Sequence, residues 1–231
     1  MISSLQTHRP SLICITGDVL YGGRPEGDRS PLETQTNVLP FLSACAAIAP
    51  TFMSLGNHEW MVDQEDLAAL TATGVMLLDN SWAERDGMVI GGLSSGYVTD
   101  YRRFRAKSGS SDRYPRQESI SGIGGAVAAS RHKPETAWLE EYSSAPGYHI
   151  LLSHHPEYLP LIPSSIELVL SGHAHGGQWQ VFNHGVWAPG QGSWPKWTRG
   201  VYENRLVVSA GLSNTTWVPR IWNPTEVVYV D

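Results

Sequence analysis

The most constraining feature of the sequence is an apolar, strand-like run that ends in a turn rich in glycine and histidine. Residues 166–170 (IELVL) are mostly aliphatic, which is typical of a buried strand. The next residues, SGHAHGGQ, contain glycines that predict a sharp turn. His173 and His175 lie one residue apart in this turn. Because neutral imidazole is the commonest protein ligand for metals, the turn predicts one side of a metal site.

Three more strand-like runs end in the same way. Each is followed at once by side chains of the metal-ligand type, namely Asp18 after the first run, Asn57 and His58 after the second, and His154 after the third. In open α/β sheets, sites form beyond the carboxyl ends of the strands. Four such endings in one chain therefore predict that these side chains converge on one site.

Composition excludes several classes of function. The chain has 231 residues, which fits one domain spanning 1–231. Its net charge of −6 provides no basic footprint, so nucleic acid is not an expected partner. Cys14 and Cys45 lie in apolar runs and are expected to be free thiols. We find no signal peptide and no apolar run of membrane-spanning length, and we expect a cytoplasmic location.

Alternating strand and helix patterns predict an α/β fold. The expected strands are 11–16, 51–55, 75–78, 88–93, 148–153, 166–170, 178–182, 205–209 and 226–230, and the expected helices are 34–49, 63–72 and 134–142. Residues 98–133 hold few aliphatic side chains and are rich in arginine, serine and glycine. We therefore expect them to form a long loop or lid insertion.

The ligand-bearing turns resemble the motifs of the calcineurin-like metallophosphoesterase superfamily. The matching segments are GDVL at 17–20, GNHE at 56–59, SHHP at 153–156 and GHAH at 172–175. The extension GHAHGGQ is similar to a bacterial branch that includes membrane-associated phosphohydrolases. The resemblance implies a four-layer α/β/β/α sandwich, in which two mixed sheets are flanked by helices. It also implies two divalent metal ions, with manganese, iron or zinc favoured by imidazole ligands.

The resemblance further implies a role for each residue. The metal ligands would be Asp18 as the bridge between both ions, Asn57, His154 and His173 on the second ion, and His175 on the first. His58 would lie near the scissile phosphate as the general acid or as a stabiliser of the leaving group, with Glu59 or a similar acid orienting it. Of the adjacent histidines 154 and 155, His154 matches the family ligand because it directly follows the strand.

These roles imply the hydrolysis of a phosphate monoester, a diester or a pyrophosphate by attack of a metal-bound hydroxide. The expected substrate is a phosphorylated small molecule or a lipid-linked phosphate. The arginine-rich stretch of the expected lid adds a hypothesis. Arg102, Arg103 and Arg105 would hold the anionic substrate or contact an anionic membrane surface. The alternative is a solvated loop without a binding role.

One motif of the superfamily is missing. The family's first motif, DxH, has no counterpart in residues 1–10, which lead directly into the first expected strand. The first metal would then keep only Asp18 and His175, so the chain could retain a single ion. We favour an N-terminally shortened form, in which a membrane anchor would also be lost, over a natural variant. The alternatives to an active enzyme are a catalytically weakened metal-binding scaffold and an inactive fragment.

Overall fold

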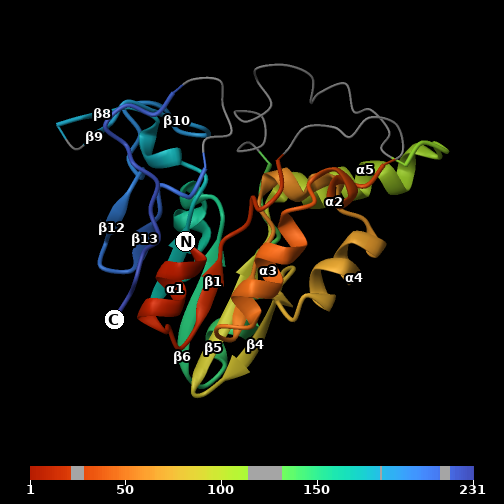
Figure 1. The fold of residues 1–231 in the computed structure, drawn as a ribbon, viewed down its shortest axis with the longest axis horizontal. Helices are drawn as coiled ribbons and strands as arrows, with labels where there is room; N and C mark the ends of the chain where they lie inside the picture. Colours follow the sequence, from red (N-terminus) through yellow and green to blue (C-terminus); the bar gives the residue numbers. More distant parts are fainter. Residues whose placement is uncertain (22–28, 114–131, 183, 214–218) are drawn as a thin grey trace.

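The computed structural model describes residues 1–21, 29–113, 132–182, 184–213 and 219–231. Two β-sheets are stacked between layers of helices (Figure 1). The smaller sheet has three parallel strands in the order β1-β2-β3. The larger is a mixed sheet in the order β12-β13-β7-β6-β5-β4, with β13, β7, β6 and β5 parallel. The expected α/β/β/α architecture of two sheets flanked by helices is confirmed.

The elements have the following bounds. The smaller sheet contains β1 (Ile13–Ile15), β2 (Thr51–Met53) and β3 (Met76–Leu77). The larger contains β4 (Ser81–Arg85), β5 (Met88–Leu93), β6 (Tyr148–Ser153), β7 (Leu168–Ser171), β12 (Gly200–Tyr202) and β13 (Leu206–Val208). Two hairpins are formed by β8 (Gln180–Val181) with β9 (His184–Gly185), and by β10 (Trp187–Ala188) with β11 (Gly192–Ser193).

The helices surround these sheets. The α-helices are α1 (Ile2–His8), α2 (Pro31–Thr34), α3 (Val38–Ala46), α4 (Gln64–Ala72), α5 (Gly96–Ser108) and α7 (Leu139–Ser144). Short 3-10 helices are η1 (Asn57–Met61), η3 (Pro156–Leu161) and η4 (His175–Gly177). The start of α4 is as the sequence predicts, because the Asp63 side chain accepts the backbone N–H groups of Glu65 and Asp66.

Alternating side chains on the strands build the layers. On β2, Phe52 packs between the two sheets with Ile150 of β6, whereas Met53 packs on the other side against α3 and α4. On β6, Leu151 faces away from the smaller sheet and packs against α7. Since successive strand residues point to opposite faces, the inner strands β2, β5 and β6 are buried on both sides. The parallel strands therefore have little freedom to slip in register, and their carboxyl ends are fixed in place.

The expected loop over 98–133 is wrong for its first part, because α5 covers residues 96–108. The helix begins at Ser95, whose hydroxyl accepts the N–H of Tyr97, and it ends at Gly109, which has a positive φ of 61°. Its buried face holds two tyrosines and a single aliphatic side chain, that of Val98. Tyr97 and Tyr101 contact Trp60 with ring centroids 6.1 and 4.4 Å away. Residues 114–131 of the expected lid lie outside the described residues.

A second correction concerns the C-terminal segment 226–230, which forms no strand in the described structure. Its side chains pack against the start of the chain instead of pairing with a sheet. The ring of Tyr229 stacks on His8 at 4.2 Å, and its hydroxyl hydrogen-bonds to Ser4 over 2.8 Å. Val227 joins the apolar cluster of Leu5. The two ends of the chain therefore stabilise each other by side-chain packing.

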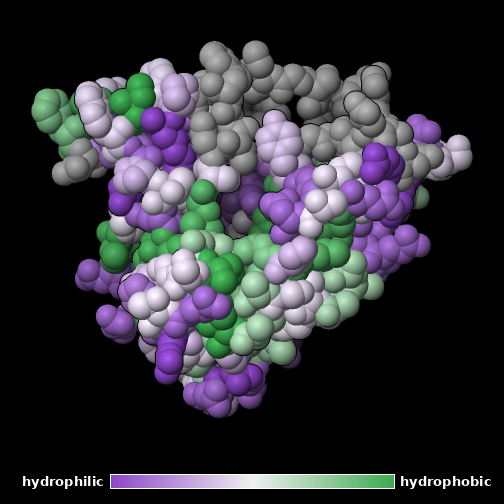
Figure 2. Space-filling view, viewed as in Figure 1, coloured by the Kyte–Doolittle hydropathy of each residue, from purple (hydrophilic) through white to green (hydrophobic). Residues whose placement is uncertain are grey.

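The surface carries two further apolar features. β1 forms an edge of the smaller sheet, and Figure 2 shows hydrophobic residues at the surface around it and α1. Several aromatic residues beyond β7 are exposed rather than buried in a core, including Phe182, Trp194 and Trp222. Within the described ranges, no helix is long and apolar enough to cross a membrane.

Candidate metal centre

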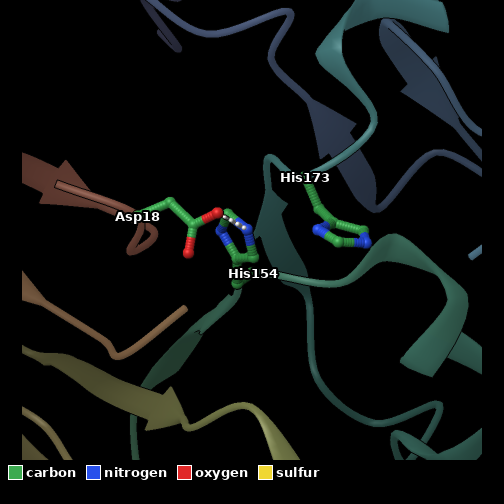
Figure 3. Close-up of side chains that lie close together, drawn as sticks. All are labelled: Asp18, His154 and His173. Carbon is green, nitrogen blue, oxygen red and sulfur yellow. Dashed lines mark ion pairs between the residues drawn. The ribbon is translucent and has the colours of Figure 1, made fainter. Parts of the chain in front are cut away.

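The turn after β1 and the turn after β6 meet at Asp18 and His154. Oδ2 of Asp18 lies 2.9 Å from Nε2 of His154 (Figure 3). Nδ1 of His154 lies 3.0 Å from the carbonyl oxygen of Thr16, so this nitrogen carries the proton and donates it. In neutral His154, Nε2 then presents its lone pair to the carboxylate. Two acceptors that face each other in a buried site are arranged like two ligands of one cation.

The charges of these two groups shift each other's pKa. Burial alone would raise the pKa of Asp18, but the neighbouring His154 and His58 hold it well below its usual value. Burial alone would lower the pKa of His154, but the Asp18 carboxylate outweighs this and raises it. Without a metal, the site therefore favours an ionised Asp18 beside a protonated His154. A divalent cation would take the place of that proton.

His173 completes a group of three ligands. One ligand atom each from Asp18, His154 and His173 lie within 4.8 Å of one another. In Figure 3, one ring nitrogen of His173 faces the Asp18–His154 pair and the other faces away from it. Burial, together with the neighbouring His155, lowers the pKa of His173 well below its usual value, so this imidazole is neutral. Neutral imidazole is the form that binds a metal.

Two glycines allow the turns to come this close. A Cβ on Gly17 would collide with the backbone of Gly56, and a Cβ on Gly56 would collide with the Asp18 carboxylate. Gly17 also has a positive φ of 98°, a conformation that side chains other than hydrogen disfavour. The glycines that precede the two ligand-bearing turns are therefore required by contact between the turns.

Two further predicted ligands carry buried acceptor atoms. Oδ1 of Asn57 and Nδ1 of His175 are both buried, and neither has a hydrogen-bond partner among the described residues. Buried polar atoms are normally satisfied, so each of these two atoms calls for a partner such as a water molecule or a cation. A carboxylate, an amide oxygen and imidazoles form a donor set that suits a divalent cation, and the residues fit such a group. The three-ligand group described above does not include His175.

His58 lies at the open side of the site. Its Nε2 is 3.8 Å from Oδ2 of Asp18, and its side chain is 21% exposed, compared with 4% for His154. Its backbone N–H donates to Oδ1 of Asp18 over 2.8 Å. His58 is thus anchored through its backbone to Asp18, while its ring can reach a molecule that enters from solvent.

Comparison with known proteins identifies the family of the chain. The sequence profile of the calcineurin-like phosphoesterase family matches residues 2–177. The chain belongs to the calcineurin-like phosphoesterase family. It is also similar to an uncharacterized metallophosphoesterase, Cj0846, of Campylobacter jejuni, with 24% identity over 248 residues. The alignment covers 100% of this chain and 53% of the relative, so the chain spans about half the length of that curated protein.

The description of this family names its members as phosphoesterases. The three-residue group at Asp18 is one of two groups of metal-ligand side chains among the described residues. The second consists of His155, Glu157 and His173.

Sequence reasoning missed Glu157. The available signal was its position, three residues beyond His154 and directly after a proline that starts η3.

Glu59 has a structural role that sequence reasoning also missed. Its side chain is fully buried, and its oxygens accept the backbone N–H groups of Asp18, Gly56 and Leu20 over 2.8, 2.8 and 3.1 Å. Burial raises the pKa of Glu59, and the nearby Asp18 charge raises it further. The carboxylate thus ties the turn after β1 to the turn after β2. The expected contact of Glu59 with the His58 ring stays a prediction.

Two arginines of α5, Arg102 and Arg103, have carboxylate partners outside the three-ligand group. Arg102 pairs with Asp79 over 2.5 Å. Arg103 pairs with Asp100 over 3.4 Å and with Glu135 over 3.2 Å. Arg105 lies on the same helix and is partly buried. A role of these three arginines in substrate or membrane binding stays a prediction.

The metal-free protein should lose stability as the pH falls below about 6.5. Burial lowers the pKa of His155 and His173 well below the usual value and that of His175 to about 4. The unfolded chain then binds protons that the folded chain does not. Each such imidazole therefore subtracts about 1.4 kcal/mol per pH unit from the free energy of unfolding. His154, with a raised pKa, is protonated in both states here and adds nothing.

Urea unfolding of the metal-free protein between about pH 6.5 and pH 5 measures this dependence. His175→Gln removes one of the neutral imidazoles, so its stability should fall less steeply with acid, by about one proton. Identical slopes for the two proteins would contradict the burial argument for His175.

Proposed function

We propose that the chain is a metal-dependent phosphoesterase that hydrolyses a phosphate monoester, a diester or a pyrophosphate. The observation that carries the proposal is the meeting of Asp18, His154 and His173 beside the partly exposed His58. A scaffold needs metal ligands but has no need of an imidazole at the open side of the site. The substrate in this proposal is a phosphorylated small molecule or a lipid-linked phosphate.

The residues divide the work between holding metal and moving protons. Asp18, Asn57, His154 and His173 would hold one divalent cation, and Asp18 with His175 would contribute to a second. Bound cations supply Lewis-acid activation of the phosphoryl group and lower the pKa of water. Thr16 fixes the tautomer of His154 through its carbonyl oxygen, which keeps Nε2 directed at Asp18. Glu59 holds the backbone of both flanking turns in place.

His58 would donate a proton to the leaving oxygen. Its ring lies at the open side of the site, and its backbone N–H bond to Asp18 fixes its distance from the ligands. A general acid matters most when the leaving group is a poor one, because an unstable oxyanion needs the proton in the transition state. An alkyl phosphate should therefore depend on His58 more than a nitrophenyl phosphate does.

His58→Ala should lower kcat for an alkyl phosphoester by about 10²–10⁴-fold, and less for p-nitrophenyl phosphate or bis-p-nitrophenyl phosphate. The assay uses the chain loaded with manganese, and the metal content of each variant is measured in parallel. His184→Ala, an exposed histidine on β9, is the matched control and should keep full activity. Equal loss with both classes of leaving group would argue against proton donation. Bound metal without turnover in the unsubstituted chain would favour the scaffold alternative.

A further inference from the structure

Behind His173, on the side away from Asp18, lies a mostly buried carboxylate, that of Glu157, which the proposed mechanism does not use. Oε1 of Glu157 lies 3.6 Å from Nε2 of His173. The Glu157 side chain is only 14% exposed, and its Oε2 is buried without a hydrogen-bond partner among the described residues. A buried carboxylate needs donors to offset its lost hydration. The imidazoles around it are the donors that the described contacts place within reach.

A second histidine fixes this carboxylate from the other side. Nδ1 of His155 lies 3.4 Å from the same Oε1 of Glu157. Nε2 of His155 is hydrogen-bonded to the Ser95 hydroxyl over 2.8 Å, and its ring packs against Tyr158 with centroids 4.7 Å apart. His155 is fully buried, so both contacts hold its ring in one orientation. The His155 ring therefore has one orientation, in which its Nδ1 faces Glu157.

We infer that Glu157, held by His155, is a positioning residue that fixes the tautomer and orientation of His173 as a metal ligand. If Glu157 accepts the N–H of His173 Nε2, the lone pair of the His173 ring lies on Nδ1. The ring nitrogen that faces away from Glu157 is the one turned toward Asp18 and His154 (Figure 3). A shift of about 0.5 Å brings the Glu157 contact to hydrogen-bonding distance.

This arrangement is the same device that Thr16 provides for His154. There a backbone carbonyl accepts the Nδ1 proton and directs Nε2 at Asp18. Here a carboxylate accepts the Nε2 proton and directs Nδ1 the same way. Carboxylate partners also raise the basicity of a ligating imidazole, which strengthens its bond to the metal. The inference rests on the proposed function only in that the Asp18 site binds a divalent cation.

Cobalt(II) binding tests the inference without any measurement of turnover. The visible absorption of bound cobalt reports ligand geometry, and titration of the metal-free chain gives the affinity and the number of ions bound. Glu157→Leu should lower the affinity about 10–100-fold and alter the cobalt spectrum. Glu157→Gln retains an acceptor oxygen and should recover part of the loss. The thermal stability of each metal-free variant, compared with that of the unsubstituted chain, checks that the protein is folded.

The chain offers a matched control. Glu167 contacts Nδ1 of His149 over 3.1 Å, in a histidine–glutamate pair outside both metal-ligand groups. Glu167→Leu should bind cobalt as the unsubstituted chain does. Equal cobalt affinities for the Glu157 and Glu167 variants would overturn the inference about Glu157 but leave the proposed function intact. Loss of one bound ion at unchanged affinity for the rest would make Glu157 a ligand and also overturn it. No cobalt binding by the unsubstituted chain would overturn the proposed function as well.

Discussion

Replacing Asp18 by asparagine should reduce kcat at least about a thousandfold and remove most of the bound metal. The bound cations are expected to contribute several kcal/mol of transition-state stabilisation, and each 1.4 kcal/mol corresponds to about tenfold in rate. The amide oxygen can still accept the backbone N–H of His58, so the turn after β1 keeps its shape. Only the charge that balances the cation is lost.

Metal content per chain, circular dichroism and turnover, measured on the same preparation, test this expectation. Asp79→Asn is the matched control, because Asp79 is also partly buried and pairs with a cation, Arg102. It should bind metal and turn over substrate as the unsubstituted chain does. Full activity of Asp18→Asn would mean that the cation is held elsewhere, and the assignment of Asp18 would be wrong.

The positions of most candidate ligands could be predicted from sequence because the end of a strand leaves a local signature. A buried strand is a short apolar run, and a ligand-bearing turn follows it directly. The residues 148–153 were expected as a strand and form β6 with those bounds. His154 then falls at the edge where neighbouring parallel strands also end. A residue that directly follows a strand in the sequence therefore also lies at this edge of the sheet in the structure.

The parts that were missed depend on contacts that no local pattern records. The periodicity of α5 is hard to detect because its large buried side chains are two tyrosines and a single valine, and the rest of the helix is rich in arginine. The role of Glu59 depends on the backbone of Asp18, 41 residues away in the chain. The inferred role of Glu157 depends on its contact with His173, which lies in the turn after the next strand, β7. Such contacts follow from tertiary packing rather than from residue type.

Removal of the Glu59 side chain should destabilise the metal-free protein more than any other single change at the site. Glu59→Ala leaves three buried backbone N–H groups without an acceptor, and each costs about 1–3 kcal/mol. The expected loss in the free energy of unfolding is on the order of 5 kcal/mol, a large share of the stability of a typical domain. Glu59→Gln keeps one acceptor oxygen and should lose about 1–3 kcal/mol.

Denaturant unfolding of the metal-free variants measures this series, because metal binding would otherwise mask the difference. Glu33→Ala is the control, since Glu33 also accepts a backbone N–H, that of the buried Ser30, but its own side chain is exposed. It should cost no more than about 1 kcal/mol. If Glu59→Ala cost as little, the two turns would be held together by the Gly17–Gly56 contact and by the His58 N–H bond to Asp18. A large loss would instead show that one buried carboxylate fixes the backbone that presents Asp18, and metal affinity should then fall together with stability.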